Sequence, residues 1–190
     1  MHTPKYFQPS ALELKQFILQ QGFGMLVSNT DNGLTSTALP FVWDDTGLHM
    51  HIARANPHWN HLDNAKVLFN VMGPHYYISP TLYQDGGVPT WNYQAAEITG
   101  RTTVFTDTKQ LEQLVNKHAA IYEKKYGTGW QPDYNPKMLT AIIGIHLHIE
   151  SIAGQFKLSQ NRTDDDQASV KSWLEKQGAG DLARTMKGQN

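Results

Sequence analysis

The segment His51-Ile-Ala-Arg-Ala-Asn-Pro-His-Trp59 indicates how this chain is organised. It continues an apolar run, Leu48 to Ile52, that is typical of a β-strand entered from the turn at residues 44–47. Pro57 cannot donate a ladder hydrogen bond, so the strand has to stop before it. The proline also biases the preceding residue, Asn56, away from the helical conformation. The segment therefore predicts a strand that ends in a defined turn.

This turn combines a cation with small residues, because Ala53, Arg54, Ala55 and Asn56 follow one another directly. Small side chains allow phosphate oxygens to approach backbone N–H groups, and a guanidinium offers a planar fork for bidentate contact. Ligand-binding loops often follow rigid strands. The alternative is that Arg54 pairs with a surface carboxylate. Taken alone, the residues permit a phosphate site at this turn, while an ion pair at the surface is the commoner explanation.

Length and composition limit the class of protein. A chain of 190 residues with 39% hydrophobic and 17% charged residues is typical of one globular domain with its own core. The net charge of −1 opposes tight nucleic-acid binding through overall charge, although it leaves room for a local patch. The absence of cysteine excludes disulfides and thiolate metal sites. No signal peptide or apolar run of membrane-spanning length is predicted, so we expect a soluble cytoplasmic protein.

Short apolar segments punctuated by Gly, Pro and Asn run through most of the chain. Ser10 and Glu13 form a capping box that predicts a helix over residues 11–20. Further helices are predicted to start near Asp107 and Asp164. Strands are predicted over residues 24–29, 34–42, 48–52, 65–71, 75–79, 90–105, 143–149 and 154–158, with a break at Gly73-Pro74. This spacing is too tight for repeated βαβ units and indicates a mainly β fold, a β-barrel with added helices. We expect one domain over residues 1–178 and a loosely held tail over residues 179–190.

Three other segments are rich in polar groups for barrel strands, and one is Gly73–Pro80, with Tyr76 and Ile78 on one face and Tyr77 and Ser79 on the other. In Val88–Tyr93, Trp91 and Tyr93 fall on one face of a strand and Asn92 on the other. An aromatic pair beside an amide can flank a flat heterocycle, although buried aromatic residues more commonly belong to a core. The segment from Lys157 to Asn161 adds a cation and three hydrogen-bonding side chains.

Histidine pairs are the remaining candidates for chemistry. His49 and His51 share one face of a predicted strand, as do His146 and His148. A metal site would need a third ligand, so hydrogen-bonded or exposed histidines are the commoner explanation and we predict no metal. Ser79 lacks a nucleophile elbow, and neither a P-loop nor a dinucleotide-binding glycine motif occurs.

Five segments together resemble one known family. They are Leu39-Pro-Phe41, His51–Trp59, Gly73–Pro80, Val88–Tyr93 and Lys157–Asn161, and they occur in the order seen in the PaiB family. Members of that family are described as FMN-binding negative transcriptional regulators. The resemblance extends over about residues 1–170 and implies an FMN-binding split β-barrel of the pyridoxamine-phosphate-oxidase type. It also implies a homodimer with FMN at the subunit interface.

The resemblance assigns roles by motif position. It implies that the turn at residues 53–56 meets the flavin phosphate and ribityl chain, with His51 close by. The segment 91–93 would lie beside the isoalloxazine or close the pocket from the partner subunit. Lys157 and Gln160 would contact the phosphate or the ring. The full set of expected FMN contacts is His51, Ala53, Arg54, Ala55, Asn56, Ser79, Trp91, Asn92, Tyr93, Lys157 and Gln160.

The predicted function is that of an FMN-binding regulator or oxidoreductase, and no residue is an evident catalytic acid or base. A DNA-binding repressor without flavin chemistry is the first alternative. Its only candidate basic surface is formed by Lys171, Lys176, Arg184 and Lys187. The second alternative is a split barrel that binds haem through a histidine.

Overall fold

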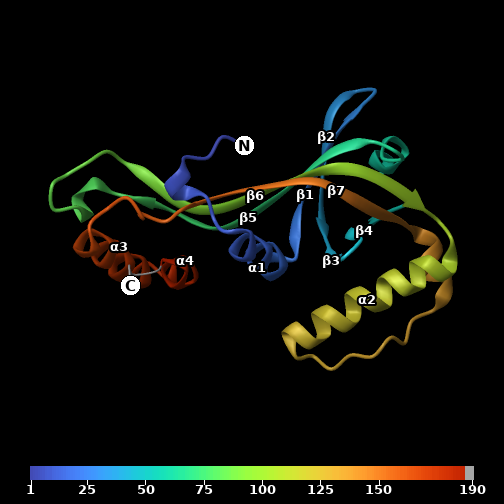
Figure 1. Ribbon diagram of the computed structural model, residues 1–190. Helices are drawn as coiled ribbons and strands as arrows, with labels where there is room; N and C mark the ends of the chain where they lie inside the picture. Colours follow the sequence, from blue (N-terminus) through green and yellow to red (C-terminus); the bar gives the residue numbers. More distant parts are fainter. Residues whose placement is uncertain (187–190) are drawn as a thin grey trace. The chain divides into compact units, whose positions relative to one another are not determined.

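The computed structural model describes residues 1–186 of the chain (Figure 1). Its helices are α1 (Ala11–Gln21), α2 (Thr108–Tyr126), α3 (Asp164–Lys176) and α4 (Gly180–Thr185). Its strands are β1 (Phe23–Thr30), β2 (Gly33–Pro40), β3 (Val42–Asp44), β4 (Gly47–Ala53), β5 (Lys66–Ile78), β6 (Thr90–Phe105) and β7 (Ile142–Lys157). Short 3-10 helices lie at η1 (Lys5–Phe7), η2 (Pro57–His61), η3 (Pro80–Leu82) and η4 (Pro136–Ala141). The fold is mainly β with added helices, as predicted.

The strands form one sheet in the order β2-β1-β5-β6-β7-β4-β3. The pairs β1–β2, β1–β5, β3–β4 and β4–β7 are antiparallel. The sheet is open because β2 and β3 are edge strands, yet it curls so that β2 also contacts β4. An open, curled antiparallel sheet with helices is the split-barrel architecture, so the predicted fold class is confirmed.

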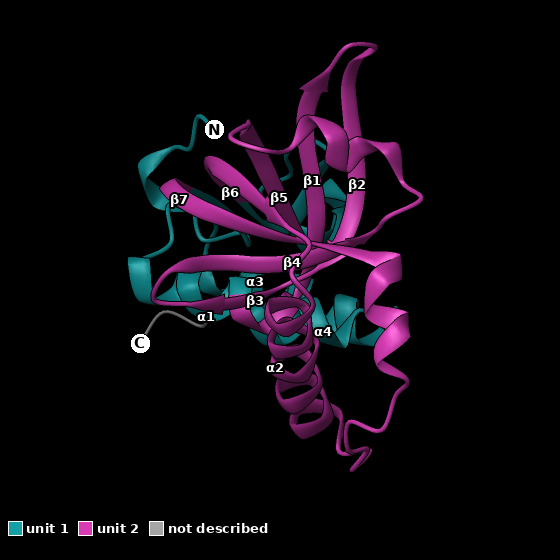
Figure 2. Ribbon diagram, turned by 90° about the vertical axis from the view of Figure 1, so that its right-hand side faces the viewer, with its two compact units in different colours: residues 1–18, 72–96, 153–190 teal, residues 19–71, 97–152 magenta. Residues whose placement is uncertain are grey.

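The chain divides into two compact units that interleave along the sequence (Figure 2). Unit 1 comprises residues 1–18, 72–96 and 153–190, and unit 2 comprises residues 19–71 and 97–152. The long strands β5, β6 and β7 contribute residues to both units. The predicted division at residue 178, with a single domain before it, stays a prediction.

Unit 2 contains the larger apolar core. Phe41 and Phe69 pack edge to face with ring centroids 5.2 Å apart, the geometry that aromatic pairs prefer. Helix α2 covers β3 and β4, and its buried side chains are Leu111, Leu114 and His118. The Tyr122 hydroxyl of the same helix donates to the Gly22 carbonyl at 2.6 Å and so fixes the helix to the chain that enters β1.

Unit 1 is organised around aromatic residues and the last two helices. Phe17 packs edge to face against Phe156 at 5.1 Å between ring centroids. Helix α3 packs against α4 (Figure 1). Trp173 of α3 contacts the Tyr76 ring edge to face. The first part of the predicted tail forms helix α4, and Leu182 of this helix is buried. The rest of the tail, from residue 187, lies outside the described residues.

Two predicted breaks in the strands are wrong. Strand β5 runs through Gly73 and Pro74, although Pro74 lacks an N–H donor. The β1 register reaches only Leu68 to Asn70 of β5, so no β1 residue is opposite Pro74 and the missing donor costs no ladder bond on that side. Likewise β7 is one strand where the sequence predicted two, because nothing between residues 149 and 154 turns the chain.

The helix starts agree with the capping chemistry in the sequence. The Ser10 N–H donates to the Glu13 carboxylate at 2.9 Å, and the Glu13 N–H donates to the Ser10 hydroxyl at 3.3 Å, so the capping box is confirmed. Asp107 caps α2 and Thr163 caps α3. No helix within residues 1–186 is both long and apolar enough to cross a membrane.

Candidate functional site

The predicted phosphate turn lies in unit 2, directly after β4. Arg54 is exposed, and its Nε donates to the Thr140 carbonyl at 2.6 Å while Nη2 donates to the Ile142 carbonyl at 3.4 Å. The Arg54 backbone N–H donates to the Ala141 carbonyl at 2.8 Å. Within residues 1–186 no carboxylate forms a salt bridge with Arg54, in contrast to the ion-pair alternative. The guanidinium is therefore held in place by neutral carbonyls and keeps its full charge unpaired.

A chain of buried hydrogen bonds supports this turn. The Asn56 amide donates to the Thr37 hydroxyl at 3.3 Å, and Thr37 contacts His58 Nδ1 at 2.8 Å. His58 Nε2 contacts the Ser28 hydroxyl at 2.8 Å, which donates to the Asn29 carbonyl at 3.5 Å. Because the Ser28 hydroxyl donates its single proton to the Asn29 carbonyl, it accepts from His58 Nε2–H, and in the neutral imidazole Nδ1 then accepts the Thr37 proton.

Burial favours the neutral form of His58. His58 is 2% exposed, and burial lowers its pKa, with the nearby His61 acting in the same direction. Asn56 also accepts from the His58 backbone N–H at 3.0 Å, so it caps η2. The turn is thus fixed from both sides, by the carbonyls that hold Arg54 and by this polar chain.

The other predicted residues lie in unit 1, so the expected FMN contacts are divided between the two units. Asn92 is completely buried, and its amide N–H donates to the Ser159 hydroxyl at 2.9 Å. Lys157 is half-buried and its ammonium donates to the Thr90 hydroxyl. Trp91 is 52% exposed and contacts the rings of Tyr77 and His75.

Two further predicted residues of unit 1, Ser79 and Gln160, form hydrogen bonds with the backbone of their own segments. Ser79 caps η3 by accepting from the Thr81 N–H at 3.3 Å. Gln160 folds back on its own segment, where its Oε1 accepts from the Leu158 N–H at 2.6 Å and its Nε2 donates to the Phe156 carbonyl. A role of these two residues in binding FMN stays a prediction, and their present contacts stabilise local turns.

His51 faces a second buried histidine. Its ring lies edge-on to His118 of α2 with centroids 5.4 Å apart. His118 donates its Nδ1 proton to the Leu114 carbonyl at 3.0 Å, which leaves Nε2 as a buried acceptor. Among residues 1–186, neither His118 Nε2 nor His51 Nδ1 has a hydrogen-bond partner. Burial lowers the pKa of both groups, that of His118 to about 4, so both rings are neutral at pH 7.

The H-x-H pairs do not form a metal centre in residues 1–186, where no three His, Asp or Glu side chains could hold an ion. His49 and His146 stack with centroids 4.4 Å apart and planes 6° from parallel, so their nitrogen lone pairs do not converge. Asp44 receives a hydrogen bond from His49 at 3.0 Å and one from Lys117. Although burial acts in the opposite direction, the hydrogen bonds from Lys117, Thr46 and His49 hold the pKa of Asp44 well below its usual range.

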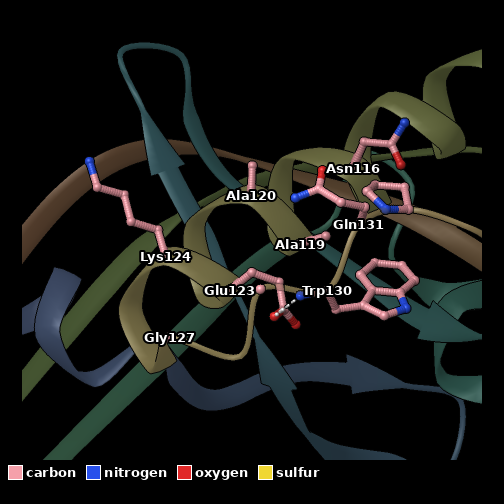
Figure 3. A pocket seen from close by; sticks show the side chains of 10 residues that line it. Asn116, Ala119, Ala120, Glu123, Lys124, Gly127, Trp130 and Gln131 are labelled. Atoms are coloured by element: carbon pink, nitrogen blue, oxygen red, sulfur yellow. Dashed lines mark hydrogen bonds between the residues drawn. The ribbon is translucent and has the colours of Figure 1, made fainter.

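A cavity of about 490 Å³ lies in unit 2 between α2 and the loop that follows it (Figure 3). Its walls include Trp130 and Gln131, and the Glu123 carboxylate accepts from the Trp130 N–H at 3.1 Å. None of the predicted FMN contacts lines it. The adjacent Glu123 and Lys124 have opposite charges, so the cavity has no single electrostatic preference for a phosphate.

The open, curled sheet with its added helices is that of a split-barrel protein. A family model described as "Putative FMN-binding domain" matches residues 1–151. The chain belongs to this FMN-binding family. The predicted resemblance to the PaiB family is thereby confirmed. The family assignment confirms the predicted flavin cofactor.

Curated relatives match nearly the whole chain. "Protease synthase and sporulation protein PAI 2" of Bacillus subtilis (strain 168) is 31% identical over 180 residues, which span 90% of this chain and 87% of that protein. An uncharacterised protein of Aspergillus fumigatus is 30% identical over 240 residues, with 92% of this chain and 91% of that protein covered. The first of these relatives supports the PaiB assignment by sequence.

Solved structures support the fold. The flavocytochrome Anf3 from Azotobacter vinelandii has a TM-score of 0.65 at 13% identity, with 82% of this chain and 72% of that chain covered. The FAD and heme binding protein from Mycobacterium smegmatis has a TM-score of 0.62 at 16% identity, with 84% and 78% covered. At these identities the likeness concerns the fold alone.

Sequence reasoning missed several residues that the structure brings to these sites. They are Ser28, Thr37 and His58 beneath the turn of unit 2, and Tyr83 and Arg162 in unit 1. The Asn-Pro-His sequence was visible, but nothing in it indicates hydrogen-bond partners that lie 21 and 30 residues away along the chain.

Proposed function

We propose that this protein binds FMN with the flavin phosphate at the turn formed by Ala53, Arg54, Ala55 and Asn56. The observation that carries this proposal is the exposed guanidinium of Arg54, which has no carboxylate partner and is oriented by two backbone carbonyls. A cation that is already oriented loses less conformational entropy when a phosphate binds. Charge-assisted contacts to phosphate are also stronger than contacts between neutral groups.

The neighbouring residues fit this role. Ala53 and Ala55 are exposed and small, so their side chains leave the Arg54 guanidinium accessible to a phosphate, whereas the N–H groups of Arg54 and Asn56 already donate to the carbonyls of Ala141 and Ala53. Asn56 is committed to the polar chain with Thr37 and to the cap of η2, and therefore orders the turn. His51 precedes the turn on the same strand and supplies a neutral ring. We assign Asn56 and His51 positioning roles.

Bound FMN would supply hydride or electron transfer, and we infer that the protein is a flavin-dependent oxidoreductase or a regulator that responds to the flavin. The chain itself binds and orients the cofactor. The catalytic residues are unknown, since no carboxylic acid or charged histidine adjoins the turn that we propose for the phosphate.

We further propose that the protein acts as a homodimer, as the family resemblance implies. In that arrangement Trp91 and Tyr93 of the partner subunit would lie beside the isoalloxazine. The exposed position of Trp91, together with the half-exposed Tyr77 ring beside it, supports this role, because exposed apolar patches on a protein surface often mark binding sites.

Titration of the flavin-free protein with FMN tests the proposal. Arg54→Ala should weaken binding by about 1.5–3 kcal/mol, the scale of a hydrogen bond to a charged group. Arg101→Ala is the matched control, because Arg101 is also an exposed cation of unit 2 but lies on β6 and pairs with Glu150 at 3.7 Å. An unchanged dissociation constant in folded Arg54→Ala would remove the turn from the site. Failure of the unaltered protein to bind FMN would reject the function.

A further inference from the structure

Unit 1 contains a cavity of its own, with a volume of about 230 Å³. Its walls combine aromatic rings with two cations, and its floor is polar. The residues that matter here are Phe7, Tyr83, Asn92, Lys157, Ser159 and Arg162. No residue of the proposed flavin turn is among the residues that line this cavity.

Both cations are held against aromatic rings. The Arg162 guanidinium lies over the Tyr83 ring at 4.0 Å, and the Lys157 ammonium lies 6.0 Å from the centre of the Phe7 ring. Cation–π contacts of this kind orient the charge without neutralising it. Gly87 allows the close approach at Arg162, because a Cβ at this position would be 2.9 Å from Nη2. Both cations are therefore fixed in position at the cavity wall.

Neither cation is neutralised by the protein. Within residues 1–186 no carboxylate lies within salt-bridge distance of Lys157 or Arg162, and no carboxylate lines the cavity. Asp164, Asp165 and Asp166 follow Arg162 in the first turn of α3, and the last two accept hydrogen bonds from Gln84 at 3.3 and 2.9 Å. Lys157 uses one of its three N–H donors on the Thr90 hydroxyl, and the others remain available.

The floor of the cavity is rigid. Asn92 is 0% exposed and pairs with Ser159, whose hydroxyl lies 2.9 Å from the amide nitrogen and 3.2 Å from the amide oxygen. The Asn92 amide also contacts the Met186 sulfur at 3.8 Å, so the segment after α4 closes the site from behind. A buried and fully paired polar floor keeps its geometry when a ligand enters.

We propose that unit 1 carries a second binding site, separate from the flavin turn, for a small phosphate- or carboxylate-bearing molecule. Two fixed, unpaired cations give the site its preference for an oxyanion, and Arg162 offers a planar fork for bidentate contact. The volume is below the range of about 300–1,000 Å³ that drug-sized ligands occupy, so the cavity takes a small anion or the anionic end of a larger molecule. The phosphate of FMN itself is the other anion that could occupy this cavity.

The experiment measures binding of inorganic phosphate and of benzoate by calorimetry, in protein saturated with FMN so that the flavin site is filled. We expect saturable binding of at least one probe. Arg162→Gln and Lys157→Gln should each weaken it at least tenfold. Lys171→Gln, an exposed cation on α3 of the same unit, should change it less than twofold. Arg162→Lys retains the charge without the fork and should give an intermediate loss.

Three results would overturn the second site. The first is that FMN-saturated protein binds neither probe. The second is that the probes bind only in the absence of FMN while Arg162→Gln weakens FMN itself, because the cavity would then hold the flavin phosphate. The third is an equal loss in Arg162→Gln and Lys171→Gln, which would indicate general screening of charge. Failure of the flavin proposal would instead appear as unchanged FMN affinity in Arg54→Ala.

Discussion

At the scale of single residues, the buried His118 makes stability depend on pH. Burial dominates its environment and lowers its pKa to about 4, helped by His51, His49 and Lys117 and opposed by the Leu114 carbonyl. The unfolded chain binds a proton near pH 6.5, whereas the folded chain binds it only near pH 4. The free energy of unfolding should therefore decrease as the pH falls through this interval, by up to about 3 kcal/mol.

Urea denaturation at pH 7.0, 5.5 and 4.5 checks this prediction. His118→Phe removes the titrating group while it retains an aromatic ring beside His51 and Tyr122, so its stability should depend less on pH than that of the unaltered protein. An equally steep pH dependence in the variant would contradict the role of His118 and direct attention to His58 and His51, whose pKa values are also lowered.

Trp91 allows a second prediction at this scale. Its indole is 52% exposed and contacts only neighbouring rings, so Trp91→Ala should leave the stability nearly unchanged. If the indole lies beside the isoalloxazine, the variant should show less quenching of flavin fluorescence on binding. Trp173→Phe serves as the control because Trp173, on α3, packs against Tyr76 of β5 and is not among the expected FMN contacts. Equal quenching in Trp91→Ala and the unaltered protein would assign Trp91 to the surface alone.

At the scale of elements, the turn after β4 depends on its support by β1 and β2. Thr37 of β2 accepts from Asn56 and donates to His58, so Thr37→Val keeps the shape of the side chain and breaks both bonds. The buried His58 Nδ1 is then left without a partner, which costs about 1–3 kcal/mol of stability. The same change should weaken FMN binding, since Asn56 would no longer order the turn.

Thr35→Val is the matched control for this prediction. Thr35 lies two residues earlier on the same strand, and its hydroxyl contacts only that of Thr30 at 3.1 Å. Chemical denaturation and FMN titration of both variants separate the two effects. A loss of stability without a loss of FMN affinity in Thr37→Val would show that the polar chain stabilises unit 2 without ordering the binding turn.

At the scale of the whole molecule, the charge distribution bears on the DNA-binding alternative. The net charge is −1, Arg184 is paired with Asp181, and Lys187 lies outside the described residues. Lys171 and Lys176 are exposed on α3, whose first turn carries three aspartates. We therefore expect no shift of DNA mobility at 50 mM salt. A shift that weakens steeply with added salt would instead support a repressor that contacts phosphates.

The secondary structure was determined largely by local sequence. The capping box at Ser10, the cap at Asp107 and the hydrophobic run of β4 predicted α1, α2 and the strand before the turn, because caps and periodicity act over a few residues. The presence of a cation between two small residues at the turn could also be read from the sequence, because Ala53, Arg54 and Ala55 are consecutive. Family motifs then indicated the flavin.

Only the tertiary structure decided how these segments are used. Pro74 is tolerated inside β5 because the β1 register ends at Asn70, and that register is fixed by strand pairing across the sheet. Arg54 is oriented by the carbonyls of residues 140 and 142. His58 is hydrogen-bonded by Thr37 and Ser28, and the Arg162 guanidinium is stacked on the Tyr83 ring. These partners lie between 21 and 88 residues away along the chain, so local pattern carries no signal of them. The sequence by itself determined the elements and the character of the turn, whereas burial and long-range hydrogen bonding decided which polar groups are fixed, neutral or available to a ligand.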